Sequence, residues 1–186
     1  FTFIKMDINK IKLKKKYDII FASHSLHHFL ELEKIFDEIN LCMHEESSFL
    51  INDMIGRNGH MFWDDTYEMV KRIWKIVPAE LKYHNQHKKH YREPIQWDCS
   101  VDGFEGIRAQ DILPLLDERF GFELFAPFFC IINRFIDRDY GHNYDLNNKL
   151  HLSILDYLWQ IEEYCLINKI LRPTQMFAIL RKNKRI

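Results

Sequence analysis

Residues 17–39 read YDIIFASHSLHHFLELEKIFDEI: a short apolar run, a polar cluster and then an amphipathic pattern. The run over residues 17–23 predicts a strand buried on both faces, as in a parallel sheet. The following stretch predicts a helix with one buried face, because its apolar residues recur at helical spacing: Leu32, Ile35, Phe36, Ile39 and Met43. Residues 49–53 predict a second buried strand. The three elements form a βαβ unit, whose crossover is almost always right-handed.

The rest of the chain extends this unit into an α/β arrangement. The same patterns predict helices over residues 67–77, 109–118 and 149–166, and strands over residues 122–129 and 176–180. Phe125–Phe129 is expected to be a buried strand, although Pro127 indicates an edge or a bend. Residues 83–106 lack periodicity and predict a long surface loop, in which His84, His87 and His90 are solvated. The chain therefore reads as a single domain over residues 1–186, with a helical insertion at about 130–171.

Composition narrows the class of protein. A chain of 186 residues, 47% of them hydrophobic, suits one domain with a sizeable core. The net charge of -1 gives no electrostatic reason to expect a nucleic-acid partner. There is no apolar stretch of about 18 residues, so no membrane span or membrane partner is predicted. The four cysteines are widely spaced, which favours reduced thiols in a cytoplasmic protein over a disulfide frame.

Polar residues follow both strands of the βαβ unit. Residues 23–29, SHSLHHF, come after the first strand, and residues 53–56, DMIG, come after the second. Ligands of open α/β sheets bind beyond the carboxyl ends of the strands, so a site is expected here. The spacings of His24, His27 and His28 make a metal site conceivable, but no cysteine or carboxylate at an obvious spacing completes the set, and no metal is predicted. The alternative is that these side chains cap the helix and the turn that follow.

Residues 17–39 resemble the fourth strand and following helix of class I S-adenosylmethionine (SAM)-dependent methyltransferases. Residues 6–9, MDIN, resemble the end of the family's third strand. Residues 53–63, 81–83 and 177–182 look like a bacterial subgroup that acts on small molecules or sugars. The resemblance covers nearly the whole chain. It departs from the family at residues 44–48, HEESS, where a turn rich in Pro and Gly is usual.

The resemblance implies a partial Rossmann-like class I methyltransferase fold, with a mostly parallel sheet and an antiparallel C-terminal strand. In the family, a GxGxG loop after the first strand and an acidic residue after the second hold the cofactor. None of the six glycines forms that motif, so these elements are expected to precede Phe1. The chain then reads as an N-terminally truncated fragment that is inactive alone. Residues 1–6 are expected to be frayed, or paired non-natively with the strand at 17–23.

The resemblance also implies SAM as the cofactor and methyl transfer to a small-molecule or glycan acceptor in the intact protein. The implied cofactor-binding residues are Asp7, Ile8, Ser23 and His24; the catalytic candidates are His27, His28 and Asp53; the substrate-binding candidates are Trp63, Tyr67 and Arg108. Methyl transfer is an in-line displacement in which a histidine can take a proton from an O–H or N–H acceptor.

Other functions stay open at this point. The alternative to the methyltransferase is a non-catalytic remnant or an interaction module that retains part of the fold, and an oligomer is possible. A different α/β enzyme, such as a hydrolase or a nucleotide-binding enzyme, is a further alternative. It leaves the combined pattern of residues 17–39 and 49–63 unexplained.

Overall fold

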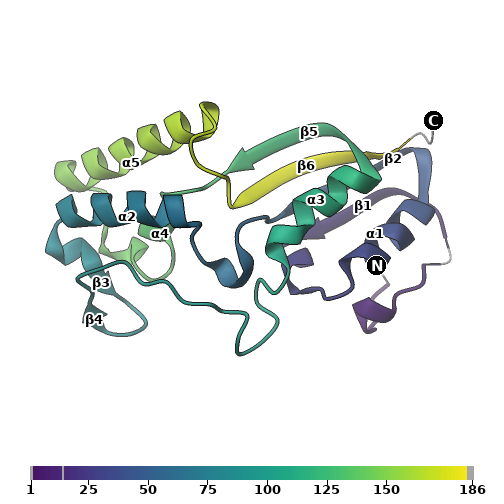
Figure 1. The fold of residues 1–186 in the computed structure, drawn as a ribbon, viewed down its shortest axis with the longest axis horizontal. Coiled ribbons are helices and arrows are strands. Elements are labelled where there is room, and N and C mark those ends of the chain that lie inside the picture. Colours follow the sequence, from purple (N-terminus) through teal and green to yellow (C-terminus); the bar gives the residue numbers. More distant parts are fainter. Residues whose placement is uncertain (1, 14, 184–186) are drawn as a thin grey trace. The chain divides into compact units, whose positions relative to one another are not determined.

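The computed structural model describes residues 2–13 and 15–183, which divide into two compact units. The sheet unit comprises Phe1–Met61, Asp98–Pro127 and Thr174–Ile186, and the helical unit comprises Phe62–Trp97 and Phe128–Pro173 (Figure 1). The single domain expected over residues 1–186 stays a prediction. Within the described ranges, none of the helices has the length and apolar character needed to cross a bilayer.

The sheet unit confirms the predicted α/β class. Its main elements are β1 (Tyr17–Ser23), α1 (Leu32–Leu41), β2 (Met43–Met54), α3 (Ala109–Arg119), β5 (Phe120–Phe128) and β6 (Gln175–Lys182). The strand order is β1-β2-β6-β5; β1 pairs parallel with β2, and β2 pairs antiparallel with β6. The arrowheads of β5 and β6 point in opposite directions, so β6 alone of these four strands runs against the others (Figure 1). The predicted antiparallel C-terminal strand is therefore present.

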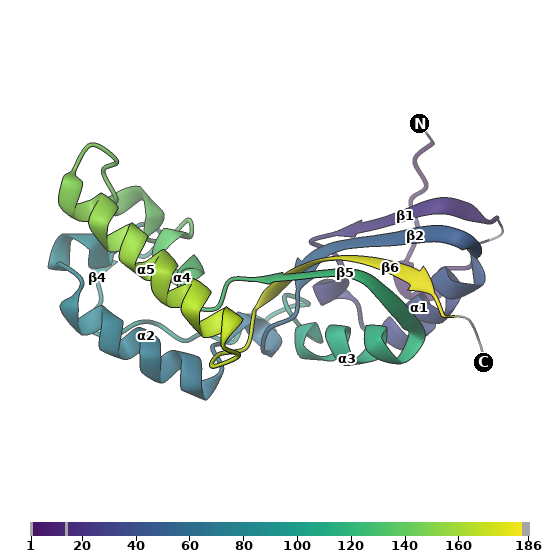
Figure 2. The same cartoon turned by 90° about the horizontal axis from the view of Figure 1, so that it is seen from above.

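Helices α1 and α3 cover the same face of the sheet, as Figure 2 shows. The apolar stripe of α1 is buried as its spacing predicts, and it packs with Phe49 and Ile51 of β2 and with Leu116 of α3. Burying each such side chain stabilises the fold by roughly 1.5–3 kcal/mol. This shared core fixes the βαβ unit and with it the edge of the sheet where β1 and β2 end.

Strand β1 has the predicted bounds, but the expectation that it is buried on both faces is wrong. Ile19 is 67% exposed and Phe21 is 61% exposed. Strand β1 is an edge strand, and successive side chains of a strand point to opposite faces. Only the alternate residues Ile20 and Ala22 reach the face that α1 and α3 cover. The expected burial of Phe125–Phe129 is also wrong for Phe125, which is 40% exposed on the edge strand β5, as Pro127 indicated.

Strand β2 begins earlier than the sequence pattern indicates. The expected turn at residues 44–48 belongs to the strand itself. The hydroxyl of Ser47 donates to the Tyr17 carbonyl oxygen at 2.6 Å and accepts from the His44 N–H at 2.7 Å. This buried side chain lies where the pairing register between β1 and β2 shifts. A hydroxyl that bridges the strands satisfies backbone groups that the irregular register leaves unpaired.

The N-terminal segment does not form the strand expected to end near residues 6–9. Residues 2–6 adopt neither helix nor strand and are exposed, which agrees with fraying rather than pairing with β1; Phe1 lies outside the described residues. Asp7 instead caps a short 3-10 helix, η1 (Ile8–Lys10), by accepting from the Asn9 N–H at 3.0 Å. A capping carboxylate competes with extended backbone, which explains the difference.

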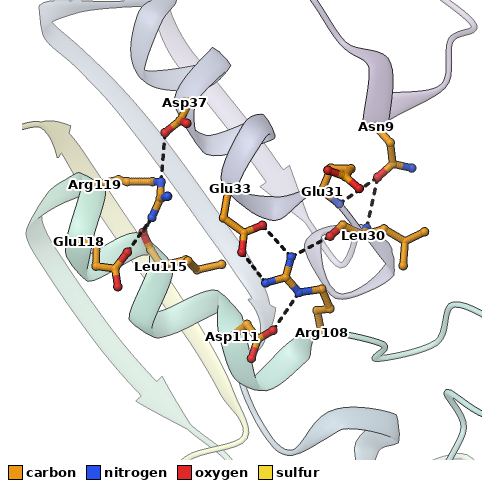
Figure 3. Close-up of polar contacts among 10 residues, drawn as sticks. All are labelled: Asn9, Leu30, Glu31, Glu33, Asp37, Arg108, Asp111, Leu115, Glu118 and Arg119. Atoms are coloured by element: carbon orange, nitrogen blue, oxygen red, sulfur yellow. Dashed lines mark hydrogen bonds and ion pairs between the residues drawn. The ribbon is translucent and has the colours of Figure 1, made fainter.

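Polar contacts tie the start of α1 to its surroundings (Figure 3). The Asn9 side-chain oxygen accepts from the backbone N–H groups of Leu30 and Glu31 at 3.2 Å each. The Arg108 guanidinium donates two hydrogen bonds to Glu33, at 2.6 and 2.7 Å. Hydrogen bonds from Arg108 hold the pKa of Glu33 down at about 2. The ion pair therefore joins α1 to the beginning of α3.

The helical unit contains the predicted helices of the remaining chain. Its elements are α2 (Asp64–Ile76), η4 (Ala79–Lys82), β3 (Tyr83–His84), β4 (Lys89–His90), α4 (Asn133–Ile136), η5 (Gly141–Asn143) and α5 (Lys149–Ile167). Trp74, Phe135 and Leu158 lie in its core. The strands β3 and β4 form a hairpin within the expected loop. His84 is 5% exposed and stacks on His87 at 4.0 Å, so the prediction that it is solvated is wrong, because the hairpin folds it inward.

A buried carboxylate organises the centre of the helical unit. Glu162 of α5 is 3% exposed, and its Oε2 accepts from the backbone N–H groups of Cys130, Ile131 and Ile132 at 3.2, 2.8 and 2.7 Å. These are the free N–H groups that precede α4. The carboxylate therefore anchors the residue 128–136 segment on α5 through three charge-assisted hydrogen bonds.

We expect Glu33→Gln to lower the stability of the sheet unit by about 1 kcal/mol at pH 7, a small effect because the ion pair is partly exposed. The folded-state pKa of Glu33, about 2, lies below its ordinary value of 4.5. The stabilisation is therefore complete above pH 4.5 and is lost as the pH falls toward 2. Urea unfolding at several pH values measures it, with Asp117→Asn, an exposed carboxylate on α3, as the control. A difference between wild type and variant that stays constant down to pH 2 would contradict the ion-pair account.

Glu162→Ala should destabilise the protein by roughly 3 kcal/mol, because three buried N–H groups lose their acceptor. Glu162→Gln retains an oxygen and should cost about 1 kcal/mol. The neighbouring Glu163 is exposed, so Glu163→Ala should change stability by less than about 0.5 kcal/mol. Denaturant unfolding followed by circular dichroism compares the three variants. Equal costs for Glu162→Ala and Glu163→Ala would rule out this role.

Candidate functional site

The carboxyl ends of β1 and β2 meet at one edge of the sheet, as the sequence predicts. Beyond Ser23 the backbone turns at His24, whose φ is 44°, and the His24 N–H donates to the Asn52 carbonyl at 2.8 Å. The short helix η2 (Leu26–His28) follows. The N–H groups of Ser25 and Leu26 each donate to Asp53 Oδ2 at 2.8 Å. Asp53 is fully buried at the end of β2. One carboxylate therefore fixes the start of the polar segment.

Asp53 also fixes the orientation of one imidazole. His27 is 3% exposed, and its Nδ1 lies 2.5 Å from Asp53 Oδ1. Burial acts to raise the pKa of Asp53, but the hydrogen bonds from His27, Ser25 and Leu26 outweigh it and hold the pKa below its usual value. Asp53 is thus a carboxylate that accepts the Nδ1–H of His27. The Nε2 atom of His27 points away from Asp53.

A second carboxylate, that of Glu105, lies close to three imidazoles. Glu105 Oε1 lies 3.6 Å from His27 Nε2 and 2.7 Å from His60 Nε2, and Glu105 Oε2 lies 3.5 Å from His28 Nδ1. Burial acts to raise the pKa of Glu105, but the hydrogen bond from His60 and the neighbouring imidazoles hold it below its usual value. We call His27, His28, Asp53, His60 and Glu105 the imidazole–carboxylate cluster.

Glycines hold the segment that carries Glu105 against the segment that carries His60. Gly59, in the short helix η3 (Asn58–His60), donates its N–H to the Gly106 carbonyl at 2.9 Å and accepts from the Cys99 N–H at 3.0 Å. Its φ is 66°, and a Cβ at this position would lie 1.9 Å from Asp98 Oδ1. Only glycine meets both conditions. The close approach brings the two side chains to the same place.

Sequence reasoning places His27, His28 and Asp53 together, and the structure does so too. The sequence alone does not identify His60 or Glu105 as residues of the site. His60 lies within residues 53–63, which carry part of the family resemblance, but nothing in its spacing distinguishes it. Glu105 lies in a stretch without periodicity, 78 residues beyond His27 in the chain. A contact at such a separation leaves no local pattern.

The other candidate residues lie in different surroundings. Asp7 and Ile8 belong to the N-terminal segment, and Ser23 and His24 are exposed at the end of β1. Trp63 and Tyr67 belong to the helical unit, where the Arg172 guanidinium lies 3.7 Å from the centre of the Trp63 ring and the Tyr67 hydroxyl donates to the Pro94 carbonyl. The Arg108 guanidinium is engaged by Glu33, Asp111 and the Leu30 carbonyl (Figure 3). The cofactor and substrate roles of these residues stay predictions.

Among the described residues, one group of side chains has the donors and spacing to hold a metal ion. One ligand atom from each of His27, His60 and Glu105 lies within 4.8 Å of the other two. His24 and His28, which the sequence pairs with His27 as a conceivable set, do not belong to this group. The cluster therefore offers two kinds of chemistry: proton exchange at an imidazole, or binding of a cation.

The chain shares sequence features with one known family. Residues 1–51 match the family model of a methyltransferase domain. That range contains β1, α1 and the first part of β2, together with His27 and His28. A search among curated proteins found no match.

Two solved structures are similar to this chain, each over 97% of its length and at 12% sequence identity. One is the O-methyltransferase from the trans-AT PKS multienzyme of Brevibacillus brevis, in complex with S-adenosyl-L-homocysteine, with a TM-score of 0.43. The other is the PH0226 protein from Pyrococcus horikoshii OT3, with a TM-score of 0.42. The chain spans 49% and 58% of their respective lengths.

Asp53→Ala should destabilise the sheet unit by roughly 3 kcal/mol, because buried N–H groups lose their acceptor. It should also release His27 from its single tautomer, which ¹⁵N chemical shifts of the imidazole nitrogens report. Asp53→Asn retains one acceptor and should cost less. Asn52→Ala, at the preceding position of β2, is the matched control and should leave the His27 signals unchanged. Unaltered His27 nitrogen shifts in Asp53→Ala would show that Asp53 does not orient this ring.

Proposed function

We propose that the protein containing this chain transfers a methyl group from SAM to a small-molecule or glycan acceptor. The match of residues 1–51 to the methyltransferase domain model is the observation that carries the proposal. The geometry supports it, since the polar segment that follows β1 lies at the carboxyl edge of the sheet, where α/β enzymes bind ligands. In this proposal the partial Rossmann-like fold supplies one wall of the cofactor site.

The residues that we propose to contact SAM suit a ligand rich in hydrogen-bonding groups. Ser23 and His24 are exposed where β1 ends, so their backbone and side chains are accessible to an amino or carboxylate group. The Asp7 carboxylate is also exposed and lies next to Ile8, an arrangement that suits an adenine ring and its amino group. When bound, SAM would supply a methyl group that its positive sulfur already activates. The chain then needs to align the acceptor and exclude water.

Within the cluster, we assign different roles to the three predicted catalytic residues. His28 is the more accessible imidazole, with 41% of its side chain exposed, and its Nδ1 is oriented by the Phe104 carbonyl at 3.2 Å. We propose that it accepts a hydrogen bond from the O–H or N–H group of the acceptor. Asp53 is fully buried and engaged by backbone N–H groups, so we propose that it positions His27. For Trp63, Tyr67 and Arg108 we propose contacts with the acceptor, a role that is proposed for each residue by itself.

A second candidate function remains: a non-catalytic remnant or an interaction module that keeps this part of the fold. The exposed apolar side chains of Ile19 and Phe21 on β1 favour it, because a free, apolar edge strand is suited to pairing with another surface. The two functions differ in one measurable property, which is saturable binding of SAM.

The test uses the complete product of the reading frame that encodes this chain. We expect SAM and S-adenosylhomocysteine to bind with micromolar affinity in isothermal titration calorimetry. Asp7→Ala should weaken binding about tenfold, because the cofactor would lose a hydrogen bond to a carboxylate. The control is Asp117→Ala, which removes an exposed carboxylate from α3 and should bind SAM as wild type does.

Two results would count against this proposal. Absence of saturable SAM binding to the complete protein would favour the remnant or interaction module. Wild-type affinity in Asp7→Ala would refute the proposed contact of Asp7 with the cofactor, even if SAM binds.

A further inference from the structure

We propose that His27, His60 and Glu105 bind one divalent transition-metal ion. The three side chains come from separate segments: η2, η3 and the loop that precedes α3. They nevertheless direct one ligand atom each to a common point, with all three atoms within 4.8 Å of one another. Two imidazole nitrogens and one carboxylate oxygen form a donor set that proteins use for Zn²⁺ and Fe²⁺.

The separations between these atoms fit a common ion. Ligand atoms about 2.1 Å from a tetrahedral ion lie roughly 3.4 Å from each other. In the structure, Glu105 Oε1 is 3.6 Å from His27 Nε2 and 2.7 Å from His60 Nε2. These two distances lie on either side of the value that an ion requires. Small side-chain rotations, together with release of the proton that His60 Nε2 donates to Glu105, would therefore complete the site.

The contact with Asp53 orients His27 toward the same point. Because Asp53 is a carboxylate, the Nδ1 atom of His27 carries the hydrogen of their contact, and Nε2 is the ring nitrogen that faces Glu105 Oε1, at 3.6 Å. A metal ion would bind at Nε2 in place of a proton.

Asp53 meets a second requirement of protein metal sites. A ligating histidine almost always donates its other ring N–H to a carboxylate or a carbonyl, which fixes the ring and raises its basicity. The Asp53–His27 contact of 2.5 Å has this form, and the backbone N–H groups of Ser25, Leu26 and Met54 hold Asp53 in place. Buried His27 thus provides a rigid ligand. Glu105, with 46% of its side chain exposed, leaves room for further ligands from solvent.

The ion would also define the chemistry of the acceptor, an extension that rests on the proposed methyl transfer. Three protein ligands leave coordination positions open. An oxygen or nitrogen of the acceptor bound at such a position would lose its proton more readily. His28 lies close by, with its Nδ1 atom 3.5 Å from Glu105 Oε2. The acceptor class that fits is a small molecule with a hydroxyl or another metal-binding group at the methylated atom. Binding of the ion itself does not depend on methyl transfer.

The experiment uses the untagged chain after treatment with EDTA and removal of the chelator. Titration with Co²⁺ alone should produce visible absorption bands of a protein-bound ion at a 1:1 stoichiometry, and Zn²⁺ should displace Co²⁺. We expect micromolar or tighter dissociation constants for Zn²⁺, measured in competition with a coloured chelator. His60→Ala and Glu105→Gln should each weaken Zn²⁺ binding at least 100-fold, and Asp53→Asn should weaken it 10- to 100-fold.

The controls separate this site from other imidazoles and from loss of the fold. His90→Ala removes an exposed imidazole of the helical unit and should leave the dissociation constant unchanged. Circular dichroism verifies that each variant is folded; because His60 and Glu105 are partly exposed, Glu105→Gln keeps the test valid if His60→Ala unfolds. Absence of 1:1 binding, or equal affinity in wild type and Glu105→Gln, would overturn the proposal. Since no SAM is present, a failure here is distinct from a failure of methyl transfer.

Discussion

The buried carboxylate of Asp53 is the group on which the site depends. It lies at the end of β2 and accepts from the backbone of Ser25 and Leu26, in the segment that follows β1. Isolated in a protein interior, a carboxylate is strongly destabilising, so it requires several hydrogen bonds. Three backbone N–H groups and the His27 ring provide them. The same bonds that make the charge tolerable also position His27, which links folding of the sheet edge to geometry of the site.

Charged side chains also hold segments of the chain together at two other places. Glu162 binds three consecutive N–H groups in the helical unit, and Arg108 binds Glu33 between α1 and α3. The two contacts differ in burial, and therefore in how much stability is lost when the contact is removed. Glu162 is nearly inaccessible to water, so its loss leaves unsatisfied N–H groups, whereas Glu33 is 44% exposed and its partner can be replaced by solvent. Buried carboxylates organise each unit, while the exposed pair adds a modest preference.

The local sequence pattern predicts where helices and strands lie in this chain better than it predicts how exposed their side chains are. The stripe beginning at Leu32 has helical spacing and becomes α1, and residues 17–23 become β1 with the predicted bounds. The prediction that β1 is buried on both faces is wrong, because a short apolar run has the same sequence pattern at the edge of a sheet as at its centre. The neighbours of a strand are set by distant parts of the chain. The early start of β2 also depends on a distant part of the chain, because the Ser47 hydroxyl donates to the Tyr17 carbonyl of the neighbouring strand.

The same distinction divides the candidate site. His27, His28 and Asp53 could be predicted because the ends of paired parallel strands must lie together. Glu105 could not, since it reaches the cluster through a loop held by the Gly59–Gly106 contact. The match to a methyltransferase domain ends at residue 51, before three of the five cluster residues. The proposed methyl transfer therefore rests on the first part of the chain, and the metal site rests mainly on side chains beyond it. The two proposals share His27 and the Asp53 carboxylate that orients it, but the metal site also needs His60 and Glu105. Each proposal can therefore hold when the other does not.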